Sequence, residues 1–212
     1  RGQIDSALVR HFCSGRNKIS SAVLKTRTKR LLETDALEAK STGLSCAFVT
    51  DYPGDRGNER AFSAYDCFTL GLAHELLGMG FKQGEIVFLL QHAKAGLRQN
   101  YKRIENYPNA FRQDVSLREY PDIPPRADSP SLCDLRAFFI FENIDQLSNA
   151  KKSAFVAPRL CFGMSALTSE IEKRSYDSMK LTVIEIANLV TSLREKLNDA
   201  PRIQRGRPRK IS

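Results

Sequence analysis

The side chains that stand out for their chemistry are arginines and lysines gathered near both ends of the chain. Of 212 residues, 33 are Lys or Arg and 24 are Asp or Glu, which gives a formal net charge of +9. Residues 1–32 hold eight basic side chains and one acid, and residues 202–212 hold five basic side chains and no acid. Positive charge concentrated in this way favours a polyanion, because bound phosphates release condensed counterions.

Two other interpretations of the charge remain open. The basic ends could only solubilise the protein. An anionic membrane could attract them, but the C-terminal tail offers only Ile203 and Ile211 as apolar anchors, so an inserting amphipathic helix is not indicated.

The tail contains the run Arg205-Gly206-Arg207-Pro208, followed by Arg209-Lys210. Glycine lets a backbone approach closely, proline fixes an extended path, and arginines suit the narrow, strongly negative minor groove of A·T-rich DNA. The run resembles the AT-hook, which implies that residues 201–212 form a disordered tail that binds A·T-rich DNA. A plain basic tail or a nuclear-localisation-like run are the alternatives.

The N-terminal segment predicts two helices joined by a short turn. Residues 4–13 and 19–34 carry apolar side chains at helical spacing, and Ser-Gly-Arg-Asn at 14–17 is typical of a turn. A short helix, a turn and a basic helix outline a helix-turn-helix, in which the second helix enters the major groove. Many helical hairpins share this outline. The candidate DNA contacts here are Arg16, Lys18, Lys25, Arg27, Lys29 and Arg30.

A β-hairpin is expected next. Residues 43–50 favour a strand, residues 53–58 are rich in turn formers, and residues 59–62 could return as the second strand. Such a hairpin would resemble a wing with Arg56 and Arg60 near its tip. An ordinary surface hairpin or a disordered loop is the alternative.

Two further helices follow. Ser63 with Asp66 forms an approximate capping box for a helix ending near Leu77. Gly78-Met79-Gly80 ends that helix, and another begins near Gln83. The second helix has the strongest periodic pattern in the chain, and core packing is the only role we assign to its apolar positions, which are Ile86, Leu89, Leu90, Ala93, Leu97, Tyr101 and Ile104.

Residues 60–90 resemble the MerR-type winged helix. An Arg-x-aromatic-Ser segment at 60–63 leads into a helix, a Gly-Phe turn follows at 80–81, and the next helix begins near Glu85-Ile86 and continues to Leu89-Leu90. Residues 4–62 match the family only in outline. The resemblance implies a winged helix-turn-helix that binds DNA and a later helix that pairs two copies.

The second half of the chain is predicted to mix strands and helices. Five prolines fall in 106–132, so residues 107–132 read as a linker. Strands are expected at 135–141 and 153–162, the latter at a sheet edge because of Pro158. Helices are expected at 166–173 and from 178 or 180 to 198. The last helix carries apolar residues at the spacing of a coiled-coil seam, which could pack internally or join a homodimer. The seam consists of Val183, Ile186, Val190, Leu193 and Leu197.

The fold expected from these patterns is mainly α with small β elements. A winged helix-turn-helix at 1–106 would be followed by the linker at 107–132, a small α+β or helical dimerisation region at 133–200, and the tail at 201–212.

Other classes of protein are disfavoured. Five widely spaced cysteines fit a reducing interior better than a disulfide scaffold, so a cytoplasmic location is expected, nucleoid-associated in a bacterium. The sequence has no signal-peptide pattern, no apolar run long enough to span a membrane, no zinc-ligand spacing and no P-loop or nucleophile elbow. We therefore expect no enzyme, no cofactor, no metal site and no membrane association.

The leading hypothesis is a DNA-binding protein, most simply a transcriptional regulator, whose partner is double-stranded, A·T-rich DNA. The second hypothesis is an architectural nucleoid-type protein with little sequence discrimination. The third is a protein-interaction adaptor whose basic ends only solubilise it.

Overall fold

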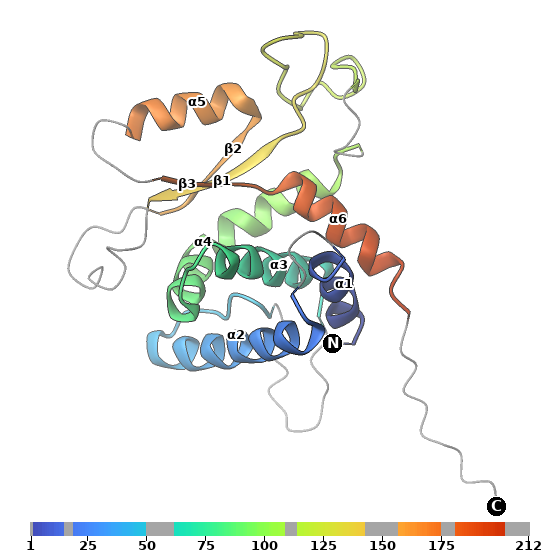
Figure 1. The fold of residues 1–212 in the computed structure, drawn as a ribbon. Helices are drawn as coiled ribbons and strands as arrows, with labels where there is room; N and C mark the ends of the chain where they lie inside the picture. The colour runs from blue at the N-terminus through green and yellow to red at the C-terminus, as the bar shows by residue number, and fades with distance from the viewer. Residues whose placement is uncertain are drawn as a thin grey trace, which may run out of the picture.

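The computed structural model describes residues 2–14, 19–49, 62–108, 114–142, 157–174 and 181–201. Over these residues the chain forms six helices and one three-stranded antiparallel sheet (Figure 1). The expectation of a mainly helical fold with small β elements is confirmed at that level. The turn expected at 53–58, the residues 59–61 and the tail from 202 onward lie outside the described residues.

The first two helices begin and end with local signals. Helix α1 (Gly2–Phe12) buries Ile4, Ala7 and Leu8. Helix α2 (Ser21–Thr42) starts at Ser20, whose hydroxyl accepts a hydrogen bond from the backbone N–H of Val23. It ends at Gly43, whose φ of 72° is one that glycine adopts without a steric penalty. Helix α2 is thus eight residues longer than the predicted 19–34 at its C-terminal end.

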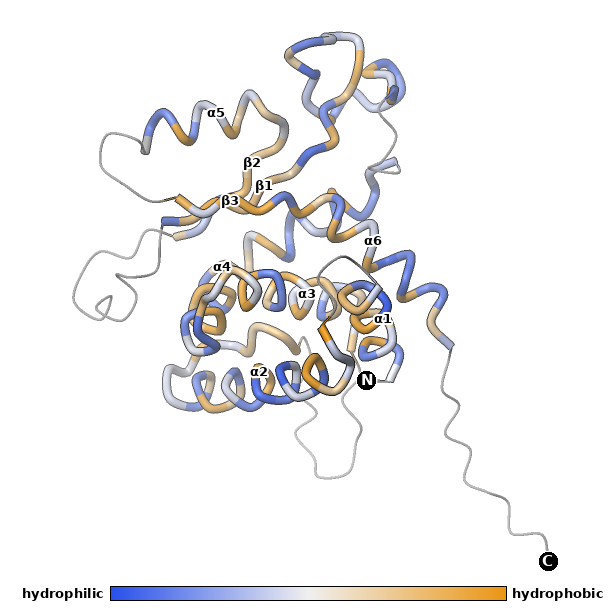
Figure 2. The backbone as a smooth tube through the Cα atoms, in the orientation of Figure 1, coloured by the Kyte–Doolittle hydropathy of each residue, from blue (hydrophilic) through white to orange (hydrophobic). Residues whose placement is uncertain are grey.

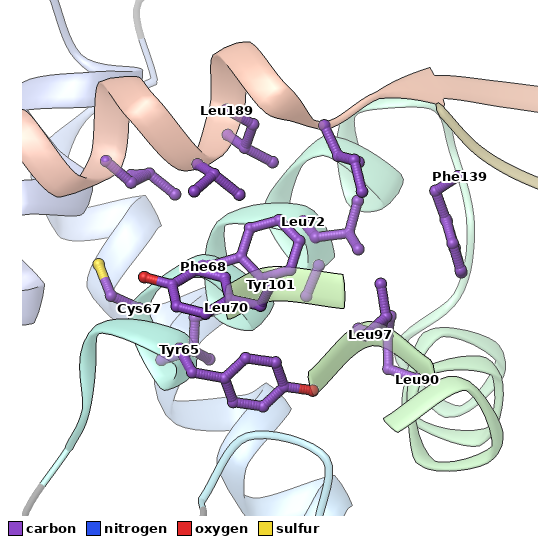
Figure 3. Close-up of a cluster of buried hydrophobic side chains, with 14 of the residues drawn as sticks. Tyr65, Cys67, Phe68, Leu70, Leu72, Leu90, Leu97, Tyr101, Phe139 and Leu189 are labelled. Atoms are coloured by element: carbon purple, nitrogen blue, oxygen red, sulfur yellow. The ribbon is translucent and has the colours of Figure 1, made fainter. Parts of the chain in front are cut away.

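Helix α3 (Ala64–Gly78) is the centre of the fold, and residues 65–74 are all buried. The predicted capping box is confirmed: Asp66 accepts from the backbone N–H of Ser63 at 2.7 Å, and the Ser63 hydroxyl accepts from the N–H of Asp66 at 3.2 Å. Helix α4 (Gln83–Glu105) and helix α6 (Ala187–Asn198) both pack against α3. Their side chains meet around the rings of Phe68 and Tyr101 (Figure 3).

The sheet lies beside this helical layer (Figure 1). Strand β1 (Ala137–Glu142) is central, with β2 (Arg159–Phe162) on one edge and β3 (Leu181–Glu185) on the other, both antiparallel to it. One face, with Phe138 and Ile140, packs under helix α5 (Gly163–Arg174). The other face joins the helical core. The predicted β1 strand and the edge position of β2 after Pro158 are both confirmed.

The strand predicted at 43–50 is wrong over its described part. Residues 43–49 contain no strand, yet Ala47, Phe48 and Val49 are buried. The backbone N–H groups of the first two donate to a side chain and not to a neighbouring strand. The Asp35 carboxylate accepts hydrogen bonds from the N–H groups of Ala47 at 2.8 Å and Phe48 at 3.0 Å. The first strand of the expected wing is therefore replaced by an irregular segment held against α2.

The helix predicted from 178 or 180 to 198 is wrong in its first part. Residues 181–185 form β3, because they pair with β1 in the register Phe139 to Ile184. Helix α6 begins only at Ala187. Val190 and Leu193 of the expected coiled-coil seam are 1% and 2% exposed within the single chain. These two side chains of the seam pack internally, whereas Val183 and Leu197 at its ends are only partly buried.

The segment predicted as a linker is partly folded onto the core. Val115 and Ile123 are buried in the cluster that also contains side chains of α1, α3, α4, β1 and α6. The N–H of Asp134 donates to the carbonyl of Pro124 at 2.6 Å. Within the described residues, one continuous apolar cluster therefore includes residues on both sides of 107–132. None of the helices described is both long enough and apolar enough to cross a membrane.

Candidate nucleic-acid interface

Four of the predicted DNA contacts lie in the described part of the chain, all on α2: Lys25, Arg27, Lys29 and Arg30. The other ten lie outside the described residues: Arg16, Lys18, Arg56, Arg60, Arg205, Gly206, Arg207, Pro208, Arg209 and Lys210.

Helix α2 has one buried face and one exposed face. Leu24, Leu31 and Asp35 are among the buried residues that pack it onto the rest of the fold. Lys25, Lys29 and Arg30 belong to its exposed residues. Hydrophilic and hydrophobic positions accordingly alternate along the helix in Figure 2. The helix is packed onto the fold along one face and presents basic side chains to solvent along the other. A helix that contacts nucleic acid requires both features.

The four basic side chains do not form a single stripe. At about 100° per residue, Lys25 and Lys29 lie within about 40° of each other around the helix axis, whereas Arg27 lies about 160° from both. Lys29 is also within 3.7 Å of Glu33, but both side chains are more than half exposed, so this ion pair restrains Lys29 only weakly. Lys25 and Lys29 form one basic flank, and Arg30 lies on the outer face beyond them.

Arg27 faces a different environment. It is partly buried, and its charge contributes to lowering the pKa of His74 on α3. Burial is the larger cause, and together they lower that pKa from 6.5 to about 4. The Thr28 hydroxyl donates to the carbonyl of Leu24, so the neutral His74 ring donates from Nε2 to Thr28 at 2.9 Å. Arg27 is thus less exposed than Lys25, Lys29 and Arg30, and it lies close enough to His74 for its charge to act there.

Asp35 is a residue whose role the sequence pattern did not reveal. Besides the two N–H groups of the 43–49 segment, its carboxylate accepts a hydrogen bond from Nε2 of Gln91 on α4 at 3.0 Å. The side chain is 1% exposed. One acid therefore fixes α2, the 43–49 segment and α4 to one another. The available signal was an acid at the i+4 position from buried Leu31, on the apolar face of α2.

Two neighbouring pockets that share Ser45 and Lys94 lie between α2, the 43–49 segment and α4, and we call them together the cleft. Its larger part has a volume of about 610 Å³ and is lined by Ser45, Gln91, His92, Lys94, Ala95, Arg98, Gln99 and Lys102. A smaller part of about 370 Å³ is lined by Ala36, Ala39, Lys40, Leu44, Ser45, Cys46, Val49 and Lys94. None of the described lining residues is acidic.

The basic side chains of this cleft were also missed from sequence. Helix α4 was assigned to packing alone, although Lys94, Arg98 and Lys102 recur every four residues along it. Lys94 lies between the two parts and donates from Nζ to the backbone carbonyl of Cys46, with the carbonyl of Val49 at 3.4 Å. Arg98 and Lys102 are exposed and form no ion pair with any described residue.

Metal binding and the reactivity of the buried Cys67 can be judged from the described residues. They contain no cluster of three or more His, Cys, Asp or Glu side chains placed to hold a metal ion. Burial, with a smaller contribution from Asp66, raises the pKa of the Cys67 thiol to about 12. That thiol is therefore protonated at neutral pH and is a packing side chain rather than a nucleophile.

The comparisons with known proteins add no family to these observations. No protein-family model, no curated protein and no solved structure matches this chain significantly.

Proposed function

We propose that this protein binds double-stranded DNA, with its tail in an A·T-rich minor groove and α2 against the adjacent duplex. The observation that carries the proposal is the basic outer side of α2: Lys25, Lys29 and Arg30 are exposed on a helix whose opposite face is buried. The Arg-Gly-Arg-Pro run at 205–208 supports it independently.

The physical basis for α2 as the contacting helix is its shape and its charge. An α-helix fits the major groove of B-DNA, and lysines beside it reach the phosphates that flank the groove. In the proposal Lys25 and Lys29 contact phosphates and Arg30 approaches the groove. Arg27 is left out of the contact set, because it lies about 160° away around the helix, next to His74.

The resemblance of residues 60–90 to MerR-type winged helix proteins supports the same function. In the proposal α3 and α4 form the base that holds α2 at a fixed orientation, α3 through His74 and Thr28, and α4 through Gln91 and Asp35. A β-strand wing is not included, because residues 43–49 form an irregular segment. The tail adds affinity by raising the effective concentration of a second contact near the first.

Transcriptional regulation is the proposed use of this binding, and an architectural role is the alternative. Footprinting on genomic fragments separates the two. A regulator protects discrete sites, whereas an architectural protein gives diffuse protection over most of each fragment.

The test of DNA binding is fluorescence anisotropy with an A·T-rich and a G·C-rich duplex over a salt series. The full chain is compared with a chain truncated after Pro201 and with the triple variant K25Q/K29Q/R30Q. Truncation should abolish the A·T preference. The triple variant should weaken binding to both duplexes alike and reduce the slope of log K against log salt by about 2 to 3, since each lost phosphate contact removes about 0.9.

The matched control is the triple variant K82Q/R118Q/K173Q, which removes three exposed positive charges from other parts of the surface. It should keep most of the affinity and most of the salt slope. The proposal fails if the full chain binds neither duplex at low salt, or if the two triple variants lose the same affinity. The first result would favour the protein-interaction adaptor.

A further inference from the structure

The cleft between the 43–49 segment and α4 has the size of a small-molecule site. Its two parts, of about 610 and about 370 Å³, share Ser45 and Lys94. Both volumes lie in the range of cavities that hold metabolites and cofactors. The DNA contacts proposed on α2 are not among the residues that line it, so a ligand bound here would be separate from them.

The wall of the cleft is preformed. Asp35 fixes Ala47 and Phe48, and Lys94 reaches the carbonyls of Cys46 and Val49. The segment is thus tied at four successive residues to α2 and α4, although it contains no strand. A wall held in this way does not have to be ordered by the ligand, so binding there avoids that entropic cost.

The two parts differ in chemistry. We call the smaller part the apolar slot, because most of its exposed lining is apolar. Its lining residues are Ala36, Ala39, Leu44 and Val49, together with Lys40, Ser45, Cys46 and Lys94. Leu44 is 39% exposed at its rim, although it is a large apolar side chain. We call the larger part the basic arm; it contains Arg98 and Lys102, one turn apart on α4, with the amide side chain of Gln99 beside them.

The charge of the basic arm indicates an anion. Arg98 and Lys102 have no acidic partner among the described residues, and Lys94 adds a third positive charge whose position is fixed by two carbonyls. Arginine and lysine side chains at this spacing suit the oxygens of a phosphate group. A ligand that fills both parts therefore carries a phosphate at one end and an apolar group at the other.

We propose that this cleft binds a small organic phosphate, with the phosphate held by Arg98 and Lys102 and an apolar ring inserted into the apolar slot. Lys94 lies at the junction and contacts the link between ring and phosphate. The site goes beyond DNA binding and stands whether or not α2 contacts DNA, since no residue is shared.

The test is calorimetric titration of the full chain with 1-naphthyl phosphate and with ADP, each of which joins a ring to a phosphate. Inorganic phosphate and 1-naphthol are the matched probes for the separate halves. At least one ring phosphate should bind, and neither half alone should bind as tightly. The variant R98Q/K102Q should weaken that binding tenfold or more, and A39L, which fills the slot with a good helix former, should weaken it by a similar factor.

The control variant R118Q/K173Q removes the same charge elsewhere and should bind the ring phosphate as the natural chain does. Thermal unfolding of all variants establishes that they fold. Binding of neither ring phosphate overturns the proposal, and so does binding that both cleft variants leave unchanged. If R98Q/K102Q instead weakens duplex binding while the ring phosphates fail to bind, the cleft is a DNA contact and the small-molecule site is wrong.

Discussion

At the scale of single residues, buried polar side chains decide how the helices fit together. Asp35 joins three elements with one carboxylate, and His74 joins α3 to α2 through Thr28. Neither is a surface residue, since both are at most 2% exposed. Buried polar groups of this kind are stabilising only while their hydrogen bonds are made. They are therefore the positions where a change in charge or shape has a large effect.

His74 makes stability depend on pH. Its pKa is about 4 in the folded chain and about 6.5 in the ordinary exposed state, so the unfolded chain binds the proton more readily in this window. The contribution of the neutral ring to stability is complete above pH 6.5 and is lost as pH falls toward 4. We predict that lowering the pH from 7 to 4.5 costs about 2 to 3 kcal/mol through this residue.

The measurement is urea unfolding of the natural chain and of His74→Gln at both pH values. Glutamine can still donate to Thr28 but does not titrate. Carboxylates contribute to the acid sensitivity of both chains, so the difference between the chains isolates His74. An equal loss of unfolding free energy in both chains would show that His74 is not the titrating group.

At the scale of elements, α6 is positioned by a small residue on α3. The position of a Cβ at Gly71 would lie 2.3 Å from Cδ1 of Leu193, and Leu193 is 2% exposed. Glycine is thus present in the middle of α3 because α6 crosses closely there, despite its lower helix propensity.

Substitution tests this close approach. Gly71→Ala should gain helix propensity but overpack the interface, for a net loss of about 1 to 2 kcal/mol. In the background of Leu193→Ala the same substitution should be neutral or stabilising, because the clashing methyl group is gone. Chemical unfolding of the two single variants and the double variant gives the coupling energy. Additive effects would contradict the proposed contact.

At the scale of the whole molecule, one large apolar cluster joins the two halves of the described chain, and a smaller cluster lies between the sheet and α5. The main apolar cluster extends from Ile4 in α1 to Leu193 in α6, and it includes Val115 and Ile123 from the segment between α4 and β1. Residues far apart in the sequence are therefore buried against one another. A division into an N-terminal and a C-terminal domain would leave both parts of this cluster exposed.

Calorimetry tests how many units unfold. We predict one heat-absorbing transition whose calorimetric and van't Hoff enthalpies agree, because disruption of either half removes the packing of the other. Ellipticity at far-ultraviolet wavelengths should follow the same transition. Two separate transitions, or a calorimetric enthalpy well above the van't Hoff value, would instead support domains divided at 107–132.

Some features of the candidate site could be predicted because they depend on neighbours in the chain. The exposure of Lys25 and Lys29 follows from the spacing of Leu24, Thr28 and Leu31 on α2. The start of α3 follows from Ser63 and Asp66, three residues apart. The cleft could not be predicted in this way, because its walls come from α2, the 43–49 segment and α4 and are joined by Asp35 and Lys94.

The sequence by itself determined the caps, the helical periodicity of α3 and α4 and the clustering of basic charge at both ends, since these depend on spacings of a few residues. Only the tertiary structure decided the states of residues 43–49 and 181–185. Both segments are rich in apolar residues, and 181–185 also contains three β-branched ones, so their local sequence suits a strand or a buried helix. The state of each segment depends on partners that are distant in the sequence. Asp35 accepts hydrogen bonds from the backbone N–H groups of the first segment, and β1 pairs with the second as a neighbouring strand. A buried backbone N–H group forms its hydrogen bond with the acceptor that the fold places next to it, and the local sequence does not specify that acceptor.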